Sequence, residues 1–121
     1  MIIVNRDQSQ PFITKDGAQI RSLLDRFNAP VQNQSLAEAT LPPGGSTGAH
    51  RHPASEEFYY VLSGRGSLTV GQETRELKPL DAVLIPPGAV HQLANKGTEA
   101  LVFLCCCAPP YSHEDTAMEA D

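Results

Sequence analysis

Two histidines separated by one residue are the first feature of this 121-residue sequence that suggests chemistry. His50 and His52 flank Arg51, and because alternate residues of a strand point to the same face, both imidazoles would lie on one side. Imidazole is a common ligand of transition metals. A His-x-His pair by itself is a weak signal that fits two ordinary surface or core histidines better, so further donors must support a metal site.

A carboxylate and a third imidazole supply such donors. Glu57 follows His52 after four residues, which lets the chain reverse and return a carboxylate to the same ion, although Glu56 competes for that role. His91 begins another predicted strand, just after the break at Pro86-Pro87-Gly88. Three imidazoles and one carboxylate suit Mn, Fe, Co, Ni, Cu or Zn better than Mg or Ca, which prefer oxygen ligands. We therefore expect one divalent transition metal ion.

Two segments resemble the sequence motifs of the cupin superfamily. The first motif has a glycine, a His-x-His pair, a glutamate and a second glycine, matched in register by Gly44, His50, His52, Glu57 and Gly64. The second motif is similar to residues 86–91, which end at His91, followed after three residues by Asn95. Each motif occurs once, and the resemblance covers roughly residues 36–107. It therefore extends over most of the chain.

The resemblance implies an all-β, double-stranded β-helix, a jelly-roll barrel of antiparallel strands. It also implies the metal ligands His50, His52, Glu57 and His91. Glu57 is selected over Glu56 because six residues separate it from Gly64, as the motif requires. One position departs from the pattern, since the second motif usually opens with glycine and Leu80 stands there, beside Asp81. This substitution affects a turn and leaves the ligand set intact.

Short strands bounded by turn residues must position these side chains. β-branched and aromatic residues in alternation predict strands over residues 58–62, 67–70, 73–77, 82–85, 91–94 and 99–107. Residues 32–41 are compatible with extended structure and stop at Pro42-Pro43-Gly44-Gly45, whereas residues 18–24 fit either a strand or one helical turn. Breaks every ten residues or so are typical of a sandwich or a small barrel.

We expect three parts in the chain: an extended N-terminal arm over residues 1–17, a barrel domain over 18–110 and a polar C-terminal tail over 111–121. The arm has room for one short strand. In the tail, Ser112 and Asp115 are spaced like a capping box, which predicts one helical turn there.

Composition limits the partners and the location of the protein. The formal net charge is −5, and the nine Lys and Arg residues are scattered, which argues against nucleic acid as a partner. No apolar run is long enough to cross a bilayer, so we expect no membrane partner. The first residues lack the basic start and long apolar stretch of an export signal. We therefore expect a cytoplasmic protein.

The three cysteines are consecutive, as Cys105-Cys106-Cys107. Neighbouring residues cannot reach ordinary disulfide geometry without distortion. Zinc sites normally separate paired cysteines by two to four residues, which also argues against a metal-thiolate site. We interpret these cysteines as small apolar residues of a buried strand.

The strand that follows Glu57 predicts an apolar outer surface. If Glu57 points inward, alternation sends Tyr59 and Val61 into the barrel. The opposite face then carries Phe58, Tyr60 and Leu62. Small cupins commonly pair their barrels, so the resemblance implies a homodimer that buries these side chains.

Three functions fit the predicted site. A divalent ion with three neutral imidazoles and one carboxylate keeps a net charge near +1, which favours small, oxygen-rich anions such as enolates and α-keto acids. The first hypothesis is a metal-dependent dioxygenase or oxidoreductase acting on such a metabolite, with Tyr59 and Gln92 as candidate catalytic side chains. The second is a sugar or phosphosugar isomerase, for which Arg51 and Arg65 are the nearest cations. The third is a non-catalytic, metal-anchored small-molecule-binding protein.

Overall fold

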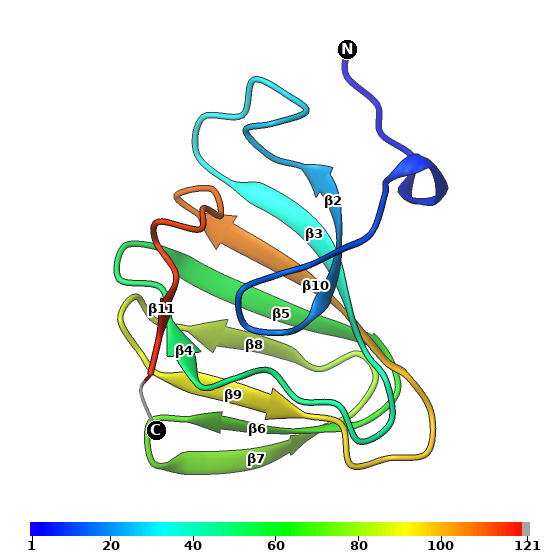
Figure 1. The fold of residues 1–121 in the computed structure, drawn as a ribbon, viewed down its shortest axis with the longest axis vertical. Coiled ribbons are helices and arrows are strands. Elements are labelled where there is room, and N and C mark those ends of the chain that lie inside the picture. The colour runs from blue at the N-terminus through cyan, green and yellow to red at the C-terminus, as the bar shows by residue number, and fades with distance from the viewer. Residues whose placement is uncertain (120–121) are drawn as a thin grey trace.

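Two antiparallel sheets form a flattened barrel in the computed structural model, which describes residues 1–119 (Figure 1). The six-stranded sheet has the order β1 (Phe12–Ile13), β2 (Gln19–Leu24), β3 (Ser35–Leu41), β10 (Leu101–Ala108), β5 (Glu56–Ser63) and β8 (Ala82–Ile85). The five-stranded sheet has the order β11 (Ala117–Met118), β4 (His50–Arg51), β9 (His91–Ala94), β6 (Gly66–Val70) and β7 (Glu73–Leu77). All strand pairs of the described residues are antiparallel, which confirms the all-β prediction.

Most strands lie where the sequence predicts them. The strands predicted over residues 73–77, 82–85 and 91–94 have the bounds of β7, β8 and β9. In the segment 18–24, for which the sequence leaves a strand and a helical turn open, Gln19–Leu24 form β2. The partner decides this choice, because β2 pairs with β3 from Gln19 opposite Thr40 to Leu24 opposite Leu36.

Both terminal segments contact the barrel. The N-terminal segment contains a 3-10 helix, η1 (Arg6–Gln8), and then β1, which pairs with β2. In the C-terminal segment the Asp115 amide donates to the Ser112 hydroxyl at 3.1 Å, as a capping box requires. The predicted helical turn does not follow, because the chain enters β11, which pairs with β4. Pairing with a distant strand outweighs the local preference.

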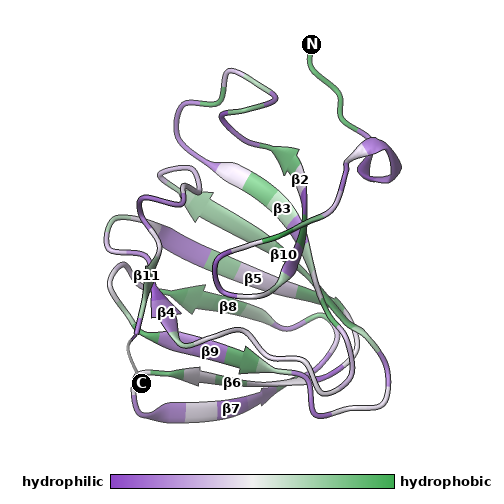
Figure 2. Ribbon diagram, in the orientation of Figure 1, coloured by the Kyte–Doolittle hydropathy of each residue, from purple (hydrophilic) through white to green (hydrophobic). Residues whose placement is uncertain are grey.

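Strand β5 separates the interior from the outer surface by alternation. Glu57, Tyr59 and Val61 are at most 4% exposed. Their neighbours Phe58, Tyr60 and Leu62 are 51%, 38% and 39% exposed. The prediction of both faces is therefore confirmed. Figure 2 shows β8 and most of β10 as hydrophobic and β7 as largely hydrophilic, in keeping with the single buried residue of β7, Leu77.

Tight turns close the end of the barrel away from Glu57. Gly64 follows the last residue of β5 and has φ +83, and a Cβ atom there would lie 2.3 Å from the Ala100 carbonyl oxygen. Only glycine fits this position, which explains the last glycine of the first motif. Leu80, where the second motif usually has glycine, also adopts a left-handed conformation, with φ 76. The turn therefore keeps the geometry of a glycine turn at a cost in backbone strain.

Candidate metal centre

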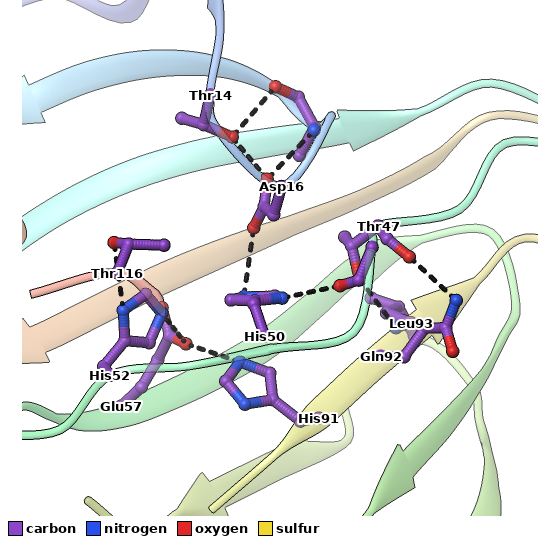
Figure 3. A network of polar contacts seen from close by, with 12 residues as sticks. Thr14, Asp16, Thr47, His50, His52, Glu57, His91, Gln92, Leu93 and Thr116 are labelled. Carbon is purple, nitrogen blue, oxygen red and sulfur yellow. Dashed lines mark hydrogen bonds and ion pairs between the residues drawn. The ribbon is translucent and has the colours of Figure 1, made fainter. Parts of the chain in front are cut away.

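Three imidazoles meet inside the other end of the barrel (Figure 3). His50 in β4 stands directly opposite His91 in β9, and opposed residues of an antiparallel pair project to the same face. Their ring centroids are 4.2 Å apart. His52 alternates back to the same side, and its centroid lies 5.2 Å from that of His50. All three side chains are buried, and one ring nitrogen of each lies within 4.8 Å of the others.

Backbone carbonyl groups fix the orientation of each imidazole. The Nδ1 atom lies at hydrogen-bond distance from a carbonyl oxygen in the pairs His50–Gly48 at 2.7 Å, His91–Ala89 at 2.9 Å and His52–Asp115 at 3.2 Å. A carbonyl oxygen only accepts, so these contacts assign the proton to Nδ1. In the neutral rings the Nε2 lone pairs are then directed into the barrel. This is the arrangement in which metal-binding histidines are commonly held.

Glu57 brings a carboxylate to the same place. Its Oε1 atom lies 3.4 Å from His52 Nε2 and 3.3 Å from His91 Nε2. Its Oε2 atom accepts a hydrogen bond from the Cys107 thiol at 3.2 Å, because Cys107 stands opposite Glu57 in the β10–β5 pair. Burial opposes ionisation, but the two imidazoles outweigh it and lower the pKa of Glu57 to about 2. The carboxylate is therefore charged at neutral pH.

The pKa values of His50 and His52 are shifted in opposite directions. Burial and the neighbouring His91 lower the pKa of His50, which keeps this ring neutral. Burial also disfavours the charged form of His52, but its contact with Glu57 outweighs burial and raises the pKa of His52. The His52 ring therefore holds a proton more readily than the His50 ring.

The donor atoms fit a metal ion. Within residues 1–119, the buried atoms His50 Nε2, Glu57 Oε1 and His91 Nε2 have no hydrogen-bond partner. Unpaired buried acceptors that face one another are unfavourable, and a cation among them removes the cost. Two ligands about 2.1 Å from one ion lie about 3.0 Å apart at a right angle and about 3.4 Å apart at the tetrahedral angle. The distances of Glu57 to the two imidazoles match this range.

A small cavity adjoins the cluster. Its volume is about 50 Å³, which holds roughly three or four water molecules. Tyr59 and Phe103 line it together with Cys105 and Cys107, and within the described residues no Lys or Arg does. Burial raises the pKa of the Tyr59 phenol and of both thiols, so these groups stay protonated. The cavity is mostly apolar, with a few polar groups next to the donor atoms.

The two candidate catalytic side chains lie in different environments. Tyr59 is 3% exposed and lines the cavity, with its ring centroid 6.1 Å from that of His91. Gln92 is exposed, because β9 begins with His91 inward and the next residue must point outward. Its side-chain amide donates to the Thr47 carbonyl at 3.1 Å. The structure therefore brings Tyr59 to the site and does not bring Gln92 there.

Three contributors to the site were not expected from the sequence. Cys107 contacts Glu57, although its run of three cysteines suggested only packing. The C-terminal segment supplies the Asp115 carbonyl that holds His52. Asp16, from the N-terminal segment, places its Oδ2 atom 3.1 Å from His50 Nε2. Strand alternation could have placed Cys107 inward, whereas no local signal points to the other two, because only tertiary packing brings the termini to the cluster.

A family model described as a cupin domain matches residues 37–107, more than half of the chain. The chain belongs to the cupin family. This cupin is 49% identical to the uncharacterized protein MJ1618 of Methanocaldococcus jannaschii over 110 residues, or 91% of this chain and 88% of that protein. It is 35% identical to an oxalate-binding protein of Thermotoga maritima over 90 residues, or 74% of each chain.

A solved structure gives the same fold. The polyketide cyclase RemF from Streptomyces resistomycificus superposes on this cupin with a TM-score of 0.83 and 26% identity, over 100% of this chain and 87% of that one. The prediction of a double-stranded β-helix is therefore confirmed. Among residues 1–119, no helix has the length and apolar character needed to cross a membrane.

Proposed function

We propose that this cupin is a metal-dependent enzyme, of the dioxygenase or oxidoreductase type, that acts on a small, oxygen-rich anionic metabolite. One observation carries the proposal: His50 Nε2, Glu57 Oε1 and His91 Nε2 converge in the barrel as buried atoms without hydrogen-bond partners in the described chain. With His52 they form the ligand set of one divalent ion, for which Mn, Fe, Co, Ni, Cu and Zn are candidates.

The protein groups prepare the site for a chelating anion. A bound divalent ion would supply Lewis acidity and positions for oxygen ligands. The carbonyl groups that hold each Nδ1 keep the imidazoles in place, and the Cys107 thiol orients the Glu57 carboxylate. The apolar cavity wall limits access of water and strengthens electrostatic interactions at the site. Tyr59 keeps its phenolic proton and can donate it in a hydrogen bond to a bound oxygen atom.

The size of the cavity and the similar proteins support a small substrate. A volume of about 50 Å³ suits a metabolite of a few heavy atoms. The relative described as oxalate-binding supports a dicarboxylate. The similarity to a polyketide cyclase supports an enolisable oxygen-rich molecule as the broader class. Oxalate is therefore the first probe, followed by α-keto acids and diketones.

Elemental analysis tests the metal centre directly. The protein is purified without added metal or affinity-tag nickel, and His52→Ala is compared with His113→Ala, a matched change in the exposed histidine outside the cluster. We expect wild type and His113→Ala to retain one transition metal ion and His52→Ala to lose it. Retention of the metal by His52→Ala would refute the ligand set.

Reloaded protein tests the reaction class. Protein reloaded with Fe, Mn, Ni or Cu is mixed with oxalate and the other probes, and ligand binding is followed by calorimetry, with oxygen uptake and carbon dioxide release as readouts of turnover. We expect one metal to support binding and turnover. If none of the four metals supports either, the enzyme proposal is wrong. Tight binding without turnover would favour the alternative of a non-catalytic, metal-anchored binding protein.

The phosphosugar isomerase alternative has less support from the cavity. A phosphate group needs cationic partners, yet Arg51 and Arg65 are exposed, and Arg51 lies 3.7 Å from Glu119 across the surface. Comparing a test sugar with and without its phosphate distinguishes this alternative. Equal affinity for the two would exclude it.

We also propose that a second copy of the chain covers the outer face of β5 and β8. This face is apolar and exposed at Phe58, Tyr60, Leu62 and Leu84. Light scattering after size-exclusion chromatography tests the homodimer, with Phe58→Glu expected to shift it toward the monomer. Cytoplasmic localisation stays a prediction from the sequence.

A further inference from the structure

We propose that Asp16 is a fifth protein ligand of the metal centre, bound through Oδ2, so that the N-terminal segment completes the site. This inference rests on the proposed function, because it needs the ion held by the three histidines and Glu57. Asp16 lies in the turn between β1 and β2, outside both sequence motifs. Figure 3 shows its side chain directed at His50.

The distance between Asp16 and His50 is that of two ligands on one ion. Oδ2 lies 3.1 Å from His50 Nε2, close to the separation of about 3.0 Å expected for ligands at a right angle. The side chains are 15% and 0% exposed, so water reaches the contact poorly. The contact therefore belongs to the buried cluster.

The two facing atoms are both acceptors. His50 Nδ1 donates to the Gly48 carbonyl, which leaves the Nε2 lone pair directed at the Asp16 carboxylate. His50 Nε2 has no hydrogen-bond partner in the described chain even though Asp16 is near. A lone pair and a carboxylate at this distance repel each other unless a cation lies between them. A shared metal ion explains the contact.

Hydrogen bonds fix which oxygen of Asp16 faces the cluster. Oδ1 accepts from the Thr14 hydroxyl and from the Ala18 amide, the latter at 3.1 Å. Oδ2 is left for the cluster, in the same way that Cys107 occupies Oε2 of Glu57 and leaves Oε1. Both carboxylates are thus held with one oxygen engaged by the protein and the other directed at the imidazoles.

The turn that carries Asp16 is held from two sides. The Gly48 amide donates to the Asp16 carbonyl at 2.7 Å, next to the start of β4. The Lys15 ammonium donates to the carbonyl groups of Thr116 at 2.9 Å and His113 at 3.2 Å in the C-terminal segment. The carboxylate is therefore positioned before an ion binds, which reduces the entropy cost of ligation.

A second carboxylate changes the charge of the centre. Three neutral imidazoles and two carboxylates balance a divalent ion, so the net charge falls from near +1 to near zero. Five protein ligands would leave one of six positions open, so an anion that binds through two oxygens would have to compete with a protein ligand such as Asp16. Asp16 would therefore strengthen metal binding and weaken anion binding.

Titration of the metal-free protein with Co²⁺ tests the inference, because Co²⁺ d–d absorption grows stronger as the coordination number falls. The variants are Asp16→Asn, which can keep the Thr14 and Ala18 contacts through Oδ1, and Asp16→Ala, which leaves no oxygen to ligate. Asp25→Asn is the matched control: it removes the same charge from the cavity lining, but its carboxylate is engaged by Ser22, Phe27 and Asn28.

We expect both Asp16 variants to bind Co²⁺ about tenfold or more weakly and with stronger d–d absorption than wild type. We also expect the Co²⁺-loaded variants to bind oxalate more tightly, while Asp25→Asn matches wild type in spectrum and affinity. An unchanged spectrum in both Asp16 variants would overturn the inference, even with weaker binding, because a charge effect alone would then suffice. If wild type and His52→Ala bind Co²⁺ alike, the metal centre itself is wrong.

Discussion

The two ends of the barrel differ in how completely their buried polar side chains are hydrogen-bonded. At the end with Gly64, Asn95 is 1% exposed, and its amide donates to the carbonyl groups of Leu41 at 3.0 Å and Glu99 at 2.8 Å. Its Oδ1 atom accepts from the Gly97 amide at 2.9 Å. The other end holds the His/Glu cluster, formed by His50, His52, Glu57 and His91. There, within the described residues, three buried side-chain atoms that could bind a metal lack hydrogen-bond partners.

This difference distinguishes a buried side chain that stabilises the fold from buried side chains that are arranged to bind a ligand. Each unpaired buried polar group costs about 1–3 kcal/mol, so a fold keeps such groups where a ligand offsets the cost. Asn95, fully paired, closes turns. The His/Glu cluster, incompletely paired, is prepared for an ion. Asn95 and His91 belong to the same sequence motif, so that motif combines a stabilising side chain with a metal-binding one.

Replacing His91 with leucine tests the functional end. Four ligands share about 10–16 kcal/mol of metal-binding free energy, so loss of one costs about 2.5–4 kcal/mol, or roughly 100- to 700-fold in affinity for Co²⁺ or Zn²⁺. The free energy of unfolding of the metal-free protein changes by only about 1 kcal/mol, because the lost Nδ1 hydrogen bond to Ala89 is partly offset by removal of the unpaired Nε2 atom. Calorimetric titration and urea unfolding measure the two quantities. Near-wild-type metal affinity would contradict the assignment of this end.

Replacing Asn95 with leucine tests the structural end. Three backbone groups lose their partner, which lowers the free energy of unfolding by about 2–3 kcal/mol. Metal stoichiometry stays at the wild-type value below the unfolding transition. Urea unfolding and elemental analysis of the same sample check both parts. The comparison fails if Asn95→Leu loses metal while stability stays unchanged.

Replacing Cys107 with alanine sharpens the comparison by removing a partner that the functional end does have. Without the thiol that donates to Oε2, the Glu57 carboxylate turns more freely, and we expect metal affinity to fall about tenfold. Cys106→Ala is the control, because alternation directs that side chain away from the cluster. Titration with Co²⁺ compares the two, and equal affinities would show that the thiol does not orient Glu57.

The smallest expected effect concerns the turn at Leu80, where φ is 76 and the side chain is 71% exposed. A left-handed residue with a Cβ atom costs about 1–2 kcal/mol, part of which glycine loses again in unfolded-state entropy. Leu80→Gly should therefore raise the free energy of unfolding by about 0.5–1 kcal/mol. Gly71→Ala makes the reverse change at φ +61 without steric contacts. Thermal unfolding of both variants should show shifts of opposite sign.

Much of the fold follows from local patterns. Strand formers between turn residues predicted β7, β8 and β9 with correct bounds, because turn residues mark the ends of short strands. The same patterns failed in the C-terminal segment, where a capping contact formed without its helix. There the pairing of β11 with β4 decided the structure.

The sequence by itself determined which side chains of the motifs face one another. Strand alternation places His50 and His52 on one face, and the resemblance to the cupin motifs predicted that His91 would join them, as the pairing of β4 with β9 shows. Tertiary structure alone decided which groups surround them. Asp16 and Asp115 arrive from the two terminal segments, and Cys107 faces Glu57 through the register of β10 against β5. Alternation is a local property of the chain, whereas the packing of a turn or a terminus onto a barrel depends on contacts between residues far apart in sequence.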